Sequence, residues 1–385
     1  MKSLRSNKLV ALLGTTAYVL VLAIAAFFAN QTTAAAIPIF AQRYHLSCET
    51  CHSVLPELNT FGLTFRALGY QLPLPKHGTT VAAIRYQMDW EETPPAGNRR
   101  YTPGGALLSN ADIGRVSAFI HYNFGASGGP AGLFLGYLAT YDAHTSTLYR
   151  AGLFELPLAQ SPGQRLDDLA PYGYYDTHVG LNDLSLSSPR WGVQVERTVG
   201  VTRIDLTADI GEFKGAVFSS KPIPTGETSS AAAPELGLFA RAPVIGSLEA
   251  GGELLTGTRR VVRSGGNPFE DGYARYGLLV HDRFARFDAQ AEQWWGRDTD
   301  IDGFGSSQRS SGGYARLKYY VTPHAYLGIR FDVAANPVAR RDVVYYGAFQ
   351  LFPQVRFLLQ QVQPLGGRGQ LGGAVTVGFP SPGKL

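Results

Sequence analysis

The sequence predicts an all-β membrane protein, with a barrel of about 16 strands after a small α-helical segment. Three observations predict this class. From about residue 79 to residue 379, apolar and polar residues alternate with the period of a β-strand. The connections between these runs alternate between short and long. The chain has 45 Gly, 20 Tyr and 21 Phe with only 17% charged residues, a composition that excludes a coiled coil and a disordered chain.

Residues 1–36 have the organisation of a secretory signal peptide. A basic start with Lys2, Arg5 and Lys8 precedes an apolar run over residues 9–28, and Ala34 to Ala36 offer a cleavage site of small residues. The apolar run is long for a signal, so an uncleaved membrane anchor is the alternative. Three of the four net positive charges lie in this leader. The rest of the chain therefore has no strong attraction for nucleic acid, and we expect no nucleic-acid partner.

Both cysteines of the chain lie in the stretch Cys48-Glu49-Thr50-Cys51-His52. C-x-x-C-H is the pattern for covalent attachment of a c-type haem, in which two thiols form thioethers and the adjacent histidine ligates the iron. We predict one haem c bound to Cys48 and Cys51, with His52 as the proximal ligand. A redox dithiol and half of a zinc site are the alternatives, but the chain has no cysteines for a four-thiolate site. Export supports the haem, because c-type attachment in bacteria occurs outside the cytoplasm.

The motif lies within a short segment, residues 37–78. Apolar residues recur after it at helical spacing, at Leu55, Leu58, Phe61, Phe65 and Leu68. Pro56 suits a first turn and Gly69 the position after a last turn, so we expect a helix over roughly 56–68 whose apolar stripe covers one face of the haem. Residues 73–78 form a linker. So short a segment buries little core without a cofactor or a larger host, and we expect it to plug the barrel.

The barrel is expected over residues 79–379, followed by a tail at 380–385. Its strands are predicted near 80–91, 112–124, 131–142, 147–158, 177–188, 191–199, 202–212, 235–242, 246–256, 272–281, 284–295, 313–321, 324–334, 342–351, 354–362 and 369–379. The clearest run sets Leu327, Ile329 and Phe331 against Arg330 and Asp332. A soluble sandwich is the alternative, but the strand lengths and the lack of interrupting helices favour an outer-membrane β-barrel in contact with lipid.

Connection lengths predict the orientation of this barrel. Short turns are expected at 200–201, 243–244, 282–283, 322–323 and 353. Longer polar loops are expected near 213–234, 257–271 and 296–312. Short turns face the periplasm in outer-membrane barrels. With both ends of the barrel domain on that side, the haem segment enters the barrel from the periplasm.

One part of the chain resembles a known family. The resemblance lies in Ile39-Phe40-Ala41-Gln42-Arg43-Tyr44, Ser47-Cys48, Cys51-His52, Pro56-Glu57-Leu58-Asn59, Phe61-Gly62, Phe65 and Gly69-Tyr70. This stretch is similar to the haem segment of outer-membrane monohaem cytochrome c–porin fusions, which include the iron-oxidising outer-membrane cytochromes. It covers only about 35 residues, and the barrel matches only in architecture, a porin of about sixteen strands.

The resemblance implies a function in electron transfer. The chain would take electrons from an extracellular donor, Fe(II) in the first place, and pass them through its single haem to a periplasmic carrier such as a small cytochrome c. A conduit for a non-iron donor or a partner cytochrome shares every sequence feature. A porin with a structural haem plug is a third interpretation. A peroxidase is disfavoured, because no distal Arg/His pair lies near the motif.

The second axial ligand of the iron stays open. Met88 is the only methionine after the leader and lies close to the motif in sequence, and Met/His ligation raises the reduction potential. A lone methionine more often serves packing. His77 in the linker is the other candidate, whereas His45 is too close to Cys48 to reach the opposite face easily. A five-coordinate iron is also compatible with the sequence.

One acidic loop imitates a calcium site. Asp298-Thr299-Asp300-Ile301-Asp302-Gly303 matches the start of an EF-hand loop, D-x-D-x-D-G. The twelfth position is Arg309, where a bidentate glutamate is needed, and no helix pattern flanks the loop. A solvated acidic loop is therefore the main expectation, with a weak external cation site as the alternative.

Overall fold

The computed structural model describes residues 39–380 except for 45, 53–57, 68–69, 71, 73–79, 94–97, 125–131, 161–167, 176–178, 183, 213–226, 231–232, 264–266, 337–338 and 353–354. Three short helices come first: α2 (Ile39–Tyr44), α3 (Cys48–Cys51) and α4 (Thr60–Ala67). Among the described residues, no helix is long and apolar enough to cross a bilayer. The predicted signal peptide, the linker and residues 381–385 of the predicted tail lie outside the described residues, while Pro380 ends the last strand.

Strands make up most of the remaining chain. They are β1 (Thr80–Thr93), β2 (Asn98–Ile113), β3 (Val116–Phe124), β4 (Gly132–Asp142), β5 (Thr147–Phe154), β6 (Arg190–Val199), β7 (Thr202–Glu212), β8 (Glu227–Ser230), β9 (Glu235–Ile245), β10 (Leu248–Arg263), β11 (Phe269–Phe284), β12 (Phe287–Asp298), β13 (Gln308–Thr322), β14 (Ala325–Asn336), β15 (Arg340–Phe352), β16 (Val355–Pro364) and β17 (Gln370–Pro380). All pairings between these strands are antiparallel.

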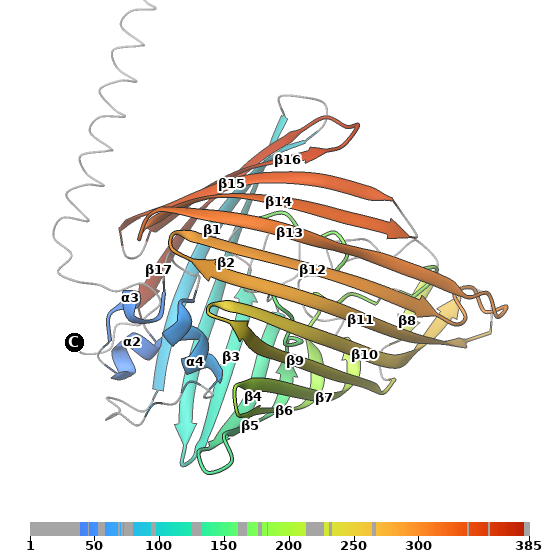
Figure 1. Cartoon of the computed structure of the whole chain (residues 1–385), viewed down its shortest axis with the longest axis horizontal. Coiled ribbons are helices and arrows are strands. Elements are labelled where there is room, and N and C mark those ends of the chain that lie inside the picture. Colours follow the sequence, from blue (N-terminus) through green and yellow to red (C-terminus); the bar gives the residue numbers. More distant parts are fainter. Residues whose placement is uncertain are drawn as a thin grey trace, which may run out of the picture. The chain divides into compact units, whose positions relative to one another are not determined.

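The strands form a closed 16-strand barrel, as predicted. Strands pair with their neighbours in sequence, and β1 pairs with β2 on one side and β17 on the other, which closes the wall (Figure 1). The short strand β8 is not part of the wall. Within the described ranges it pairs with the end of β10, while β9 lies between β7 and β10.

The two faces of each strand meet different surroundings. In β14, Leu327 and Ile329 point outward with 61% and 42% of their surfaces exposed, whereas Tyr326 and Arg330 point into the lumen and are buried. Similar outward residues occur around the wall, among them Leu206, Leu238, Leu278, Leu317, Phe349 and Leu359. An apolar belt of this extent is stable only in contact with lipid. Closure of the wall pairs each of its 16 described strands on both sides.

The predicted number of strands is right although the predicted list omits one strand of the wall and contains one segment that is not a strand. Residues 98–113 form β2, which was not predicted because Pro103-Gly104-Gly105 resembles a turn; Gly105 lies against the Phe124 ring, which a Cβ would meet at 2.3 Å. Residues 177–188 were predicted as a strand, but the structure describes turns and one isolated bridge there. Apolar residues of this stretch, among them Val179, Leu184 and Leu186, are buried inside the barrel. The alternation in the sequence therefore reflects packing against the wall and not a strand of the wall. Two of the short turns, predicted at 243–244 and 282–283, fall a few residues later, at 246–247 and 285–286.

Residues 155–189, here called the lumen segment, connect β5 to β6 and fold back into the barrel. Its buried side chains include Leu156, Leu158, Tyr172, Tyr174, Tyr175, Leu184 and Leu186. They pack on the lumen-facing side chains of Phe239, Leu255, Tyr273, Trp294 and Tyr314. A second contact joins Ala170 to Tyr326, Val344, Tyr346 and Leu358. The core of this protein therefore lies inside the barrel.

Candidate haem segment and barrel interior

Backbone contacts hold the C-x-x-C-H motif against α4. The Cys51 carbonyl accepts a hydrogen bond from the Asn59 N–H at 2.9 Å. The Asn59 side chain donates to the Thr50 carbonyl at 3.1 Å and accepts from the Gly62 N–H at 2.9 Å, so it caps α4. A Cβ at Gly62 would lie 2.1 Å from the Cys51 carbonyl oxygen, so only glycine permits this contact.

The helix was predicted over roughly 56–68, but α4 begins at Thr60. Leu58 forms an isolated β-bridge with His52, and Asn59 then starts the helix as its cap. The expected apolar stripe is divided: Phe65 is 3% exposed, whereas Phe61 is 39% exposed. Protein therefore covers one side of α4 next to the motif and leaves the Phe61 side open.

An aromatic cluster joins this segment to the barrel wall. Phe40 stacks on Tyr70 with ring centroids 4.4 Å apart, Tyr70 stacks on Phe119 at 5.6 Å, and Phe119 stacks on Tyr137 at 5.3 Å. Phe119 and Tyr137 are lumen-facing residues of β3 and β4. Cys51 packs against the same cluster. Stacked rings of this kind contribute about 0.5–1.5 kcal/mol per pair beyond their buried area.

A buried arginine adds polar contacts between helix and wall. Arg43 of α2 is fully buried, and its guanidinium donates to the side chain of Asn110, to the Asn110 carbonyl at 3.1 Å and to Asp112 at 3.2 Å. Asn110 in turn donates to the Ser117 hydroxyl at 2.8 Å. Sequence reasoning missed this anchor. The available signal was a basic residue inside an otherwise apolar run.

The structure describes the side chains of three predicted haem-binding residues: Cys51, His52 and Met88. Cys51 and His52 are half-buried neighbours at the end of α3, while the Cys48 side chain, His45 and His77 lie outside what the structure describes. Met88 is 40% exposed on the outward face of β1, in line with Ile84 and Tyr86. This placement agrees with the packing alternative for Met88, because the helical segment contacts lumen-facing residues. The second axial ligand stays unassigned.

A small cavity lies where the helical segment meets the lumen segment. Its volume is about 50 Å³. Arg66 and Tyr70 border it from the helical segment, Phe154 from the end of β5, and Glu155, Leu156, Pro157 and Leu158 from the start of the lumen segment. Leu135, Tyr137, Arg150, Gln194, Glu196 and Arg203 complete its lining from the barrel wall. Such a space is too small for a haem ring but holds a few water molecules or a small polar group.

Charged side chains fix the lumen segment to the wall. Arg330 is fully buried, donates to both oxygens of Asp168 at 2.8 and 2.7 Å, and also contacts Asp332 at 2.8 Å. Its guanidinium lies 3.9 Å from the centre of the Tyr172 ring. Glu292 accepts hydrogen bonds from the Tyr175, Trp294 and Tyr314 side chains. Buried charges with this many partners are satisfied within the protein and not by water.

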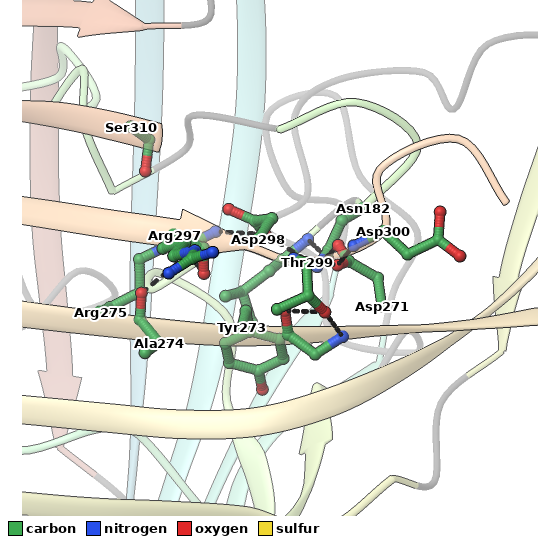
Figure 2. Close-up of polar contacts among 12 residues, drawn as sticks. Asn182, Asp271, Tyr273, Ala274, Arg275, Arg297, Asp298, Thr299, Asp300 and Ser310 are labelled. Carbon is green, nitrogen blue, oxygen red and sulfur yellow. Dashed lines mark hydrogen bonds and ion pairs between the residues drawn. The ribbon is translucent and has the colours of Figure 1, made fainter. Parts of the chain in front are cut away.

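At the long-loop end, one amide connects two carboxylates (Figure 2). Asn182 of the lumen segment donates to Asp271 at 2.9 Å and to Asp298 at 3.3 Å. Arg275 donates to Asp298 at 2.9 Å. Asp271 also accepts the backbone N–H groups of Thr299 and Asp300 at 3.0 and 2.9 Å. These contacts close the lumen segment against the rim of the barrel.

The last two carboxylates of the D-x-D-x-D-G loop accept hydrogen bonds from the loop itself. Asp300 accepts the N–H groups of Gly303 and Gly305, and Asp302 accepts those of Phe304 and Ser306. Strands β12 and β13 flank the loop, so no EF-hand helices are present. Within the described ranges, no group of three or more His, Cys, Asp or Glu side chains could hold a metal ion.

The barrel is similar to solved outer-membrane proteins. An anion-selective porin from Comamonas acidovorans matches with a TM-score of 0.54 and 12% identity over 78% of this chain and 98% of the porin. The outer membrane channel DcaP of Acinetobacter baumannii has a TM-score of 0.52, 11% identity and coverage of 78% and 96%. OmpT of Vibrio cholerae has a TM-score of 0.51, 8% identity and coverage of 78% and 97%. No family model and no curated protein matches the sequence.

At these identities the comparison concerns the fold alone. The chain has the closed antiparallel β-barrel of the outer-membrane porins. The apolar belt around the wall supplies an independent physical argument that the barrel contacts lipid. Fold and belt together indicate an outer-membrane location.

Proposed function

We propose that this chain is an outer-membrane electron-transfer protein, a monohaem cytochrome c fused to a porin-like barrel. It takes electrons from an extracellular donor, for which Fe(II) is the first candidate, and passes them to a periplasmic carrier. The observation that carries the proposal is the C-x-x-C-H motif on a helix whose Cys51 packs against an aromatic cluster of the barrel interior.

The residues around the motif fit a covalent haem. The thiol of Cys51 and the imidazole of His52 are adjacent and half-buried, as thioether and proximal ligand require. The exposed Phe61 offers an apolar surface beside the motif. When bound there, a c-type haem supplies one-electron redox chemistry. Asn59 and Gly62 fix the position of the motif, and the aromatic cluster limits its access to water.

A porin that conducts solutes is the second candidate, and the porin-like fold favours it. The lumen argues against an open water channel. Lumen-facing charged residues such as Asp288, Glu292, Lys318 and Arg330 are at most 2% exposed, whereas the wall charges of a conducting pore are hydrated. The lumen segment contacts Glu292 through Tyr175 and Arg330 through Asp168. We therefore interpret the barrel as a housing that lets electrons cross while the donor and its oxidised product stay outside.

An anaerobic spectroscopic experiment tests the proposal. Fe(II) is added to the oxidised full-length protein in detergent, and the visible spectrum is recorded over time. We expect sharp bands of reduced haem within seconds. His52→Ala should abolish reduction by Fe(II) while the barrel stays folded, and the outward-facing Met88→Leu should react like the wild type.

Each other outcome has a defined meaning. If dithionite reduces the haem but Fe(II) does not, Fe(II) is not the donor. Electron transfer from another donor would then be the remaining function. A spectrum without haem bands would overturn the cytochrome. Steady ion conductance of the unmodified protein in planar bilayers would support the pore over the housing.

A further inference from the structure

The cavity of about 50 Å³ between the helical segment and the lumen segment is lined by three arginines and two glutamates: Arg66, Arg150, Arg203, Glu155 and Glu196. Arg203 in its wall is paired: it lies 2.9 Å from Glu196 and 3.2 Å from Asp205. Arg150 of β5 is different. Its guanidinium donates to the neutral amide of Gln194 at 2.5 Å and lies 4.7 Å from the centre of the Tyr137 ring.

Among the described residues, no carboxylate lies within 4.0 Å of the Arg150 guanidinium. Its charge also acts on Glu196 in the same cavity, but that carboxylate is already paired with Arg203. The Nε atom of Arg150 is also buried without a hydrogen-bond partner. A guanidinium in a lumen is partly desolvated, and an unused donor there is costly unless an acceptor arrives. Arginine is the side chain that best matches a planar carboxylate, through two parallel charge-assisted hydrogen bonds. Arg150 therefore has the chemistry of half of an ion pair.

The position of the cavity indicates which carboxylate pairs with Arg150. Its lining shares Tyr70, Leu135, Tyr137 and Phe154 with the aromatic cluster on which Cys51 packs. A haem attached through its vinyl groups presents its two propionates at the opposite side of the ring. The cavity admits a carboxylate group and excludes the ring itself.

We propose that this cavity is a carboxylate site and that Arg150 binds a propionate of the haem attached at Cys48 and Cys51. This inference rests on the proposed function. Arg150 neutralises the propionate and holds the haem at the junction between the helical segment and the lumen segment. A fixed positive charge beside the haem favours the reduced iron, which carries one positive charge fewer than the oxidised iron. Arg150 therefore raises the reduction potential.

The test is a redox titration of the full-length haem-loaded protein in detergent between pH 5 and pH 8. Covalent attachment keeps the haem in every variant, so the potential can be compared directly. In Arg150→Gln the ratio of reduced to oxidised haem at a fixed electrode potential should fall about tenfold, a typical effect of one unit charge inside a protein. The potential should also vary more steeply with pH, because an unpaired propionate titrates in this range. Arg150→Lys should stay closer to the wild type.

Arg309→Gln is the matched control, since it removes one exposed arginine at the far end of β13 and should leave the potential unchanged. Circular dichroism reports whether each barrel is folded. Haem bands with the same potential and pH profile in Arg150→Gln and Arg150→Lys as in the wild type would overturn the inference and leave the proposed function intact. A wild-type potential that shifts with added acetate would assign the site to a free carboxylate instead. Wild-type protein without haem bands would overturn the proposed function itself.

Discussion

Replacement of Arg330 by glutamine is expected to release the lumen segment from the barrel wall. The Nη1 atom of Arg330 donates to both carboxylate oxygens of Asp168. The guanidinium also contacts Asp332 and donates to the carbonyls of Ala170 and Pro171 at 3.1 Å each. Removing one partner of such a buried network costs about 3–5 kcal/mol, because the two carboxylates stay buried without a countercharge. This cost corresponds to a rise of roughly 10²–10⁴-fold in the fraction of molecules with an undocked segment.

Limited proteolysis and bilayer conductance measure this release. In Arg330→Gln we expect new cleavage between residues 155 and 189 and an ion conductance absent from the wild type. The added change Asp168→Asn removes one of the stranded charges and should restore part of the protection. Arg341→Gln, an exposed position on the neighbouring strand β15, is the control and should behave like the wild type. Equal protease resistance and equal conductance in Arg330→Gln and the wild type would refute the reasoning.

Three further predictions concern the haem segment and the rim. Gly62→Ala places a Cβ 2.1 Å from the Cys51 carbonyl, and we expect a lower haem content per chain in purified protein; wild-type content would contradict the close contact. Asn59→Ala removes the cap of α4 and should cost about 1–2 kcal/mol, seen as faster hydrogen exchange in residues 60–67 and disproved by unchanged rates. The Ser306 hydroxyl and the Phe304 N–H, both donating to its carboxylate, hold the pKa of Asp302 below its usual range. Because the folded pKa is the lower one, this contribution to loop order is present above the unfolded pKa and is lost as the pH falls through the folded pKa. Exchange in residues 299–307 should accelerate there but not in Asp302→Asn.

The wall of the barrel could be predicted from the sequence because its physics is local. Successive residues of a strand point to opposite faces, so Leu327 faces the outside and its neighbours face the lumen. This alternation can be read directly from the sequence. The strand at 98–113 escaped prediction because Pro103 and its glycines carry a turn signal that pairing with β1 overrides. The C-x-x-C-H motif could be recognised for a similar reason, since the haem attachment that we propose depends on a local spacing within five residues.

The interior could not be predicted in this way. Residues 177–188 alternate like a strand in the sequence, yet Val179, Leu184 and Leu186 are buried inside the barrel. The partners of this stretch lie about a hundred residues later. Asn182, for example, bonds to Asp271 and Asp298, with sequence separations of 89 and 116. The proposed role of Arg150 likewise depends on a neighbouring strand. The residue paired with it on β6 is Gln194 and not a carboxylate. No periodicity encodes such pairings.

The lumen segment also has a consequence for the order in which the protein becomes native. Its hydrogen-bond partners are synthesised long after it. Glu292 follows Tyr175 by 117 residues, and Arg330 follows Asp168 by 162 residues. Gln360 follows Leu169 by 191 residues. Contacts of such separation form slowly, and until they form the tyrosines and leucines of the segment are exposed to water and to other chains. Folding of the barrel interior therefore depends on the C-terminal strands, and a nascent chain needs protection from aggregation until those strands are in place.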